Sequence, residues 1–194
     1  MSKKKVAVIL ASTVLIASLV IGGTLAYLTS NATVTNTFTM GDVKILLAEP
    51  AWKPADGLGM LPGDTVDKDP TVKELKGNSY MRIKMEIVEN DGTAITSAAR
   101  IKLIKDTITG LDTTKFTLDT TRPTPTDPSV SYYNYVGILS EGQTAILFTG
   151  IAIPVGYKSA DITLMGEYKI KLTAEAIQSD NLTQAAAYTA LDAG

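Results

Sequence analysis

The stretch Tyr80–Val88, YMRIKMEIV, alternates between apolar and charged side chains from Met81 to Ile87. A period of two is that of a β-strand with one buried face. The apolar side chains that we expect to point into a core are Met81, Ile83, Met85 and Ile87. The charged side chains that we expect to face water are Arg82, Lys84 and Glu86. Asp91-Gly92 is a turn signal that ends the strand.

Working outward, further strands are predicted on both sides. Val43–Ala48 is an extended stretch before the central strand, and three strands follow it: Val130–Leu139, Thr144–Ile153 and Ile162–Ile177. Ser140–Gln143, with the sequence SEGQ, reads as a tight turn between the first two of these.

Helical patterns are short and few. Ile95–Ile108 repeats apolar residues at helical spacing, and Gly110 fits a stop. Asn181–Leu191 reads as a closing helix, capped at Asp180 or Asn181. We therefore expect helices only as insertions in a β domain.

Proline and glycine mark residues 50–64 and 119–129 as loops. Leu61-Pro62-Gly63-Asp64 has proline and glycine at the positions that a type II turn requires. Strands separated by turn signals predict a mainly all-β fold, an antiparallel two-sheet sandwich of the jelly-roll kind with short helical insertions.

Residues 1–26, MSKKKVAVILASTVLIASLVIGGTLA, have the organisation of a signal peptide. A lysine cluster precedes the apolar run Val6–Ile21, which as a signal helix is shorter than the roughly 20 residues that span a bilayer. We predict cleavage after Ala26, with Thr24 and Ala26 as the small flanking residues and Tyr27 as the new terminus. The alternative is an uncleaved membrane anchor.

Composition narrows the function. Hydrophobic residues make up 45% of the 194, which excludes a wholly disordered chain. Three of the 18 basic residues lie in the signal segment, which leaves 15 against 20 acids and argues against nucleic acid as a partner. The chain has no histidine and no cysteine. Histidine-based triads and thiolate or histidine zinc sites are therefore excluded, and we expect neither an enzyme nor a cofactor.

Residues 27–40, YLTSNATVTNTFTM, are uncharged and alternate strictly. Threonine occupies most of one face, which favours a strand. The other face carries Leu28, Ser30, Ala32, Val34, Asn36, Phe38 and Met40. Such a strand either pairs at the edge of its own domain or, once freed by proteolysis, joins the sheet of another molecule. The chain thus divides into a signal peptide (1–26), an N-terminal strand (27–40) and a β-sandwich domain (41–194).

Two clusters invite a binding function. One is acidic and could attract calcium: Asp64, Asp67 and Asp69. Its spacing matches no EF-hand loop and Lys68 lies within it, so we favour a solvated turn. The other is aromatic and could stack on a glycan: Tyr132, Tyr133 and Tyr135. Alternation puts the last two on one face, which favours a role in the core.

Several segments in order carry a family resemblance: GGTLAYLTSNATVTNTFTMGDVKI, LPGDTVDKDPTV, NSYMRIKMEIV, YYNYVGILSEGQTAILFTGIAIP and KLTAEAIQSDN. The chain resembles the TasA and camelysin (CalY) family of Gram-positive bacteria. The resemblance implies removal of the signal peptide by an ER-type signal peptidase. It also implies a jelly-roll domain that polymerises into biofilm-matrix fibres, in which each mature N-terminus adds a strand to a neighbour. Carried onto this sequence, the resemblance implies a donor of about Tyr27–Thr37, with Leu28, Ser30, Ala32 and Val34 on its inserted face. Glu74–Gly77 departs from the family pattern, which often has Asn and Gly in a tight turn at this point.

We therefore expect a secreted, cell-surface-associated fibre subunit whose partners are its own copies, the signal peptidase during export and an accessory fibre protein. Contact with the membrane is expected only through the signal peptide. One alternative is a monomeric surface or spore-coat adhesin. Another is the metallopeptidase activity attached to camelysin, for which the sequence supplies no histidine.

Overall fold

The computed structural model describes residues 43–122 and 127–193, and its longest strand is β4 (Asn78–Val88), where the alternating stretch predicts one. The four apolar side chains expected to point inward are at most 1% exposed. β4 belongs to a sheet of order β11-β4-β7-β6, in which every pair is antiparallel. The other strands of this sheet are β11 (Lys169–Gln178), β7 (Val130–Tyr135) and β6 (Phe116–Leu118), and β8 (Leu139–Ser140) pairs with the start of β4.

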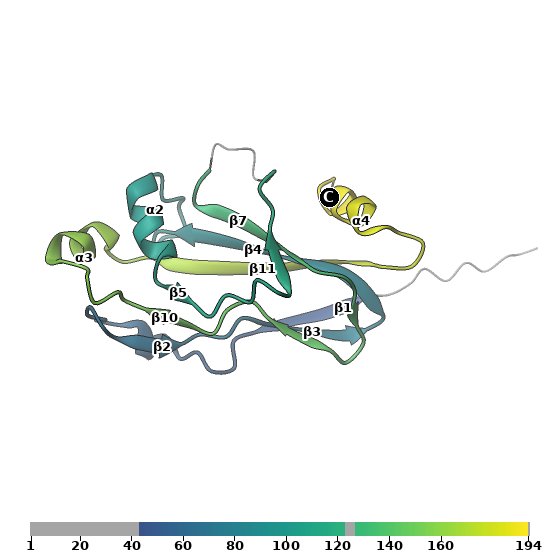
Figure 1. Ribbon diagram of the computed structural model, residues 1–194, viewed down its shortest axis with the longest axis horizontal. Coiled ribbons are helices and arrows are strands. Elements are labelled where there is room, and N and C mark those ends of the chain that lie inside the picture. The colour runs from purple at the N-terminus through teal and green to yellow at the C-terminus, as the bar shows by residue number, and fades with distance from the viewer. Residues whose placement is uncertain (1–42, 123–126, 194) are drawn as a thin grey trace, which may run out of the picture. The chain divides into compact units, whose positions relative to one another are not determined.

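Two smaller antiparallel sheets face this one. The first has the order β1-β3-β9 and consists of β1 (Lys44–Ala48), β3 (Thr71–Lys76) and β9 (Thr144–Ile146). The second has the order β2-β10-β5 and consists of β2 (Thr65–Asp67), β10 (Gly150–Ala152) and β5 (Ile108–Thr109). Figure 1 shows β1, β2, β3 and β10 in one layer and β4, β7 and β11 in the other.

Apolar side chains from all three sheets meet between the layers. The main core consists of Val72, Met81, Ile83, Met85, Phe116, Tyr133, Leu139, Ala145, Leu147, Phe148 and Ile151. A second cluster packs beneath the helices at the end of β4 and consists of Ile87, Ile95, Ile101, Ile104, Ile153 and Met165. The mainly β, antiparallel prediction is thus confirmed. The strands of the described residues divide among three sheets where we expected two, and the jelly-roll connectivity stays a prediction.

The division into three sheets has a local cause in the predicted strand Thr144–Ile153. Leu147 and Phe148 are consecutive and both fully buried. Two successive inward side chains break the period of two that one continuous strand needs. The chain therefore leaves the first small sheet after β9 and enters the second at β10.

The described residues include three short α-helices: α2 (Ala98–Lys105), α3 (Ser159–Met165) and α4 (Gln184–Leu191). A single 3-10 turn, η1 (Pro54–Gly57), lies in the first proline loop. The α2 prediction is confirmed with narrower bounds, because Ser97 caps the helix by accepting from the Arg100 amide at 3.3 Å. α4 starts later than expected because the cap is Thr183, which accepts from the Ala186 amide at 3.3 Å.

The prediction of a continuous strand over Ile162–Ile177 is wrong in its first part, where α3 ends. The carboxylate of Asp161 accepts from the Lys158 amide at 2.8 Å and closes the first turn of this helix. Gly166, with φ of +54°, ends it. The alternating pattern holds only from Lys169, where β11 begins.

Both predicted turns are present. The Asp64 amide donates to the Leu61 carbonyl at 2.9 Å, and Gly63 has φ of +97°, as a type II turn requires. The Gln143 amide donates to the Ser140 carbonyl at 2.9 Å. The strands that flank this second turn do not pair with each other, since β8 joins β4 and β9 joins β3.

Candidate functional site

β11 is a long strand at the edge of the largest sheet. Its ladder with β4 runs over all ten residues, from Lys169 opposite Val88 to Gln178 opposite Ser79. Among the described strands, none pairs with its other side. The remaining edge strands of the described sheets have two to five residues. Since natural sheets keep exposed edges short, a ten-residue open edge is a candidate site for adding a strand.

The inward face of β11 is apolar and only half-buried. It consists of Ile170, Leu172, Ala174 and Ala176, which pack against the main core. Each lies opposite one of the fully buried inward residues of β4. Among the described strands, β4 has neighbours on both sides and β11 on one, which accounts for the difference in exposure. A further strand along this edge would cover apolar surface as well as backbone.

β1, an edge of the facing layer, lies next to β11 without being hydrogen-bonded to it in the ladder. Its residues Ile45 and Leu47 are half-buried against the same core. Two strand edges from opposite layers therefore flank the interior on this side of the domain.

Glu74 and Ser79 form a buried polar bridge near the start of β1. Both side chains are fully buried, and the Ser79 hydroxyl donates to Oε2 of Glu74 at 2.5 Å. Glu74 is on β3 and Ser79 is on β4, so the bond joins the two layers. Oε1 of Glu74 has no hydrogen-bond partner among the residues that the structure describes. Sequence reasoning did not single out this carboxylate. Its place at an inward position two residues after Val72 was the available signal.

Arg82 contradicts the prediction that it faces water, because it is only 3% exposed. Its Nε donates to Glu175 at 2.5 Å, Nη1 pairs with Asp192, and Nη2 donates to the Leu191 carbonyl at 3.0 Å. The guanidinium also lies 4.9 Å from the centre of the Tyr132 ring. The outer face of β4 is thus covered at this point by the end of α4.

Tyr188 fixes α4 to the same sheet. Its hydroxyl donates to the Tyr135 carbonyl at 2.7 Å, and burial raises the pKa of this phenol. Farther along the outer face, Glu86 pairs with Lys84 at 2.8 Å and Lys171 at 3.1 Å. Burial alone would raise the pKa of Glu86, but hydrogen bonds from the two lysines outweigh it and hold the pKa below its usual value. This face is a network of satisfied charges, which indicates a structural role.

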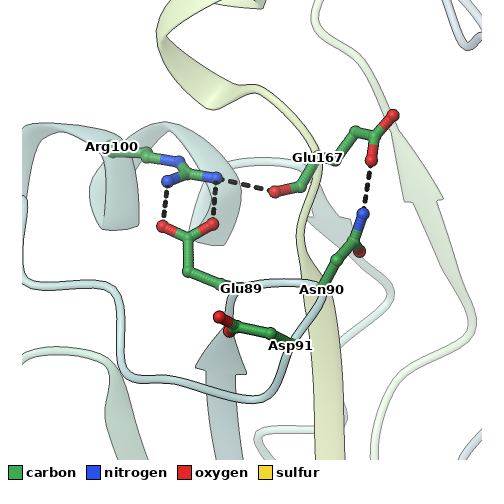
Figure 2. A pocket seen from close by; sticks show the side chains of 5 residues that line it. All are labelled: Glu89, Asn90, Asp91, Arg100 and Glu167. Carbon is green, nitrogen blue, oxygen red and sulfur yellow. Dashed lines mark hydrogen bonds and ion pairs between the residues drawn. The ribbon is translucent and has the colours of Figure 1, made fainter.

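A small polar hollow lies where β4 ends and β11 begins (Figure 2). It is lined by Glu89, Asn90, Asp91, Arg100 and Glu167. Arg100 donates to both carboxylate oxygens of Glu89, at 2.5 and 3.1 Å, and to the Glu167 carbonyl at 2.7 Å. Asn90 donates to the Glu167 carboxylate. Asp91 accepts from the amide and the hydroxyl of Thr93, at 2.9 and 2.8 Å. Each of the five side chains thus has a partner, and the hollow ties α2 to the neighbouring loops.

The acidic cluster predicted as a solvated turn has structural partners. Asp64 accepts from the Leu61 amide and Asp69 from the Ala51 amide, both at 2.8 Å. Lys68 is buried, pairs with Glu49 at 2.6 Å and lies 4.5 Å from the centre of the Trp52 ring. Within residues 43–122 and 127–193, no group of three or more metal-binding side chains comes together.

The tyrosine cluster divides between the two faces of β7, as alternation predicts. Tyr133 and Tyr135 join the main core, where the Tyr135 ring meets Phe116 edge to face at 5.5 Å. Tyr132 lies on the other face with Arg82. The predicted cleavage and donor residues lie outside the described part of the chain: Thr24, Ala26, Tyr27, Leu28, Ser30, Ala32 and Val34.

The described residues form a mainly β, antiparallel domain whose longest edge strand, β11, has no partner on its outer side among them. Residues 1–98, half of the chain, match the family model described as camelysin metallo-endopeptidase. The chain belongs to this family, that of camelysin and TasA, and the resemblance seen in the sequence is confirmed. β11 lies beyond the matched residues. Searches of curated proteins and of solved structures gave no match. In the part that the structure describes, no helix is long and apolar enough to cross a membrane.

Proposed function

We propose that the chain is a secreted structural subunit that polymerises into extracellular fibres, in which the N-terminal strand of one copy pairs with β11 of the next. The observation that carries this proposal is the open edge of β11, ten residues long and backed by a half-buried apolar face. Membership of a family that includes fibre-forming proteins supports it.

The proposed donor suits this edge in length and chemistry. Tyr27–Thr37 has eleven residues and no charged side chain, so placing it against a sheet desolvates no ionised side chain. Leu28, Ala32 and Val34 alternate with polar residues at the period of a strand, with Ser30 on the same face. In a ladder with β11, this face would lie beside the half-buried inward residues of β11.

Processing would make the donor available. The lysine cluster and apolar run of residues 1–21 have the organisation of a signal peptide, and cleavage after Ala26 would release the strand from the membrane. We expect the peptidase that acts there to control when assembly starts. An accessory fibre protein could use the same edge to begin or end a fibre.

The family description names a metallo-endopeptidase, and the residues at hand do not fit a zinc site. The chain contains no histidine or cysteine, and carboxylates form no three-membered cluster in the described residues. Protein zinc sites are built mainly from those two residue types. We therefore derive no hydrolytic step for this chain.

Electron microscopy of two purified proteins tests the proposal. One begins at Tyr27 and the other at Phe38, which removes the donor and keeps every described residue. We expect filaments from the first protein alone. Filaments from both proteins would show that assembly does not need residues 27–37, which would rule out the donor-strand proposal. A monodisperse monomer from the first protein, with its surface binding retained, would instead favour the adhesin.

A further inference from the structure

Glu74 is a buried carboxylate with an incomplete set of hydrogen-bond partners in the part of the chain that the structure describes. The side chain is 0% exposed, yet Oε1 has no hydrogen-bond partner and no ion pair joins it to a cation within the described residues. A buried carboxylate that lacks a partner is costly. Ser79 supplies one hydrogen bond to the other oxygen, at 2.5 Å. The position therefore calls for a second donor, preferably a cationic one.

The bridge between Glu74 and Ser79 lies at a defined end of the β11 edge. Glu74 is opposite Ile45 near the start of β1, and Ser79 is opposite Gln178 at the end of β11. The inward side chains of β11 are Ile170, Leu172, Ala174 and Ala176, and Gln178 follows them opposite Ser79 at this end. Both alanines and Gln178 are half-buried, so the inward side chain of the edge that lies level with the bridge is polar.

The topology fixes which end of a donor strand would arrive here. β1 starts at the end of the domain where β11 finishes, so each subunit's N-terminal segment leaves from that end. If a donor ran parallel to β11, it would leave the acceptor at this same end. Like ends of two subunits would then meet, and the reciprocal exchange would close a dimer. An open fibre requires the donor to run antiparallel to β11, which places its first residue at the Glu74 end.

We propose, on the basis of the proposed function, that Glu74 binds the ammonium group at the processed N-terminus of a second copy of the chain. Cleavage after Ala26 converts an uncharged peptide group at Tyr27 into a cation. Its N–H groups would donate to Oε1 of Glu74 in a charge-assisted hydrogen bond. An unprocessed copy lacks this cation, so Glu74 would favour processed donors over unprocessed ones.

The test changes the charge of the terminus without changing the fold. Mature protein that begins at Tyr27 is acetylated at about pH 6.5, where lysines are protected by their protonation and the α-amine reacts. A matched sample is reductively dimethylated, which adds similar bulk and keeps the charge. Light scattering gives the critical concentration for assembly. We expect acetylation to raise it about 10- to 100-fold, the effect of losing a hydrogen bond to a charged group, and dimethylation to leave it nearly unchanged.

Substitution of the carboxylate supplies the second arm. Glu74→Gln should raise the critical concentration of the unmodified protein to a similar extent, and acetylation should add nothing further, because both changes remove the same contact. Ser79→Ala is the control, since it keeps the carboxylate and should keep the sensitivity to acetylation. Thermal unfolding of each variant verifies the fold.

The outcomes separate the two proposals. If acetylated and unmodified proteins assemble alike, or if the losses from acetylation and from Glu74→Gln multiply, Glu74 does not bind the terminus and strand addition stands. If the unmodified mature protein forms no filaments, both proposals fall.

Discussion

At the residue scale, Arg82 holds the closing helix on the domain. It is 3% exposed and joins two carboxylates, on β11 and after α4, to a backbone carbonyl. Replacement by methionine keeps much of the buried stem, leaves Glu175 without its cation and leaves Asp192 paired only with Arg122. Breaking a buried pair costs about 3–5 kcal/mol, and the partial exposure of Glu175 and Asp192 reduces this to about 2–3 kcal/mol. We expect Arg82→Met to lower the free energy of unfolding in urea by that amount.

Lys84→Met is the matched control for this change. Lys84 is on the same strand and face, and pairs with Glu86 at 2.8 Å with more exposure to solvent. Such pairs contribute about 0–1 kcal/mol. If both substitutions lowered the free energy of unfolding equally, the buried ion pairs of Arg82 would contribute no more to stability than the more exposed pair of Lys84.

The inward residues of β4 could be read from the sequence, because alternation depends only on near neighbours. The burial of Arg82 could not. The helix that covers Arg82, α4, begins more than a hundred residues later, and a local sequence pattern carries no information about such a distant contact. The burial of Glu74 was not predicted for a related reason, because its partner Ser79 is on the next strand, in the opposite layer.

At the element scale, β11 should be protected when a donor strand binds. A peptide with the sequence of residues 27–37, added to protein that begins at Phe38, is expected to form a new ladder along the open side of β11. Amide hydrogen exchange should slow in Lys169–Gln178, since roughly half of its backbone groups gain partners. β6, the opposite edge of the same sheet, should keep its exchange rate.

A scrambled peptide of the same composition is the control for binding that does not depend on register. Protection of β6 in place of β11, or no protection at all, would move the acceptor site away from the edge that we propose.

Helices and strands were predicted correctly where a single periodicity of apolar residues ran through the segment. The predictions were wrong where one apolar stretch contained two elements. Ile162–Ile177 combines a helix and a strand that both carry apolar residues, and the boundary depends on Asp161 and Gly166. Thr144–Ile153 reads as one strand until the paired inward residues Leu147 and Phe148 are seen in place. The open edge of β11 was beyond sequence reasoning, since pairing partners come from distant parts of the chain.

At the scale of the whole molecule, donor and acceptor make a subunit polar. A filament built by strand addition has one end with a free donor strand and one with an open β11 edge. Protein that begins at Phe38 has the edge and lacks the donor. It can therefore bind only where a donor protrudes, and once bound it offers no donor for the next subunit.

As the concentration of this truncated protein increases, the rate of filament growth should therefore fall to a constant value above zero. Seeded growth followed by fluorescence microscopy should show one end blocked and the other still elongating. The peptide of residues 27–37 has the opposite deficiency and should block the open β11 end, so that the two together arrest both ends. Truncated protein found in the interior of a filament would contradict the scheme. A subunit without a donor strand would then have been followed by another subunit, which requires contacts other than the donor strand to hold the filament together.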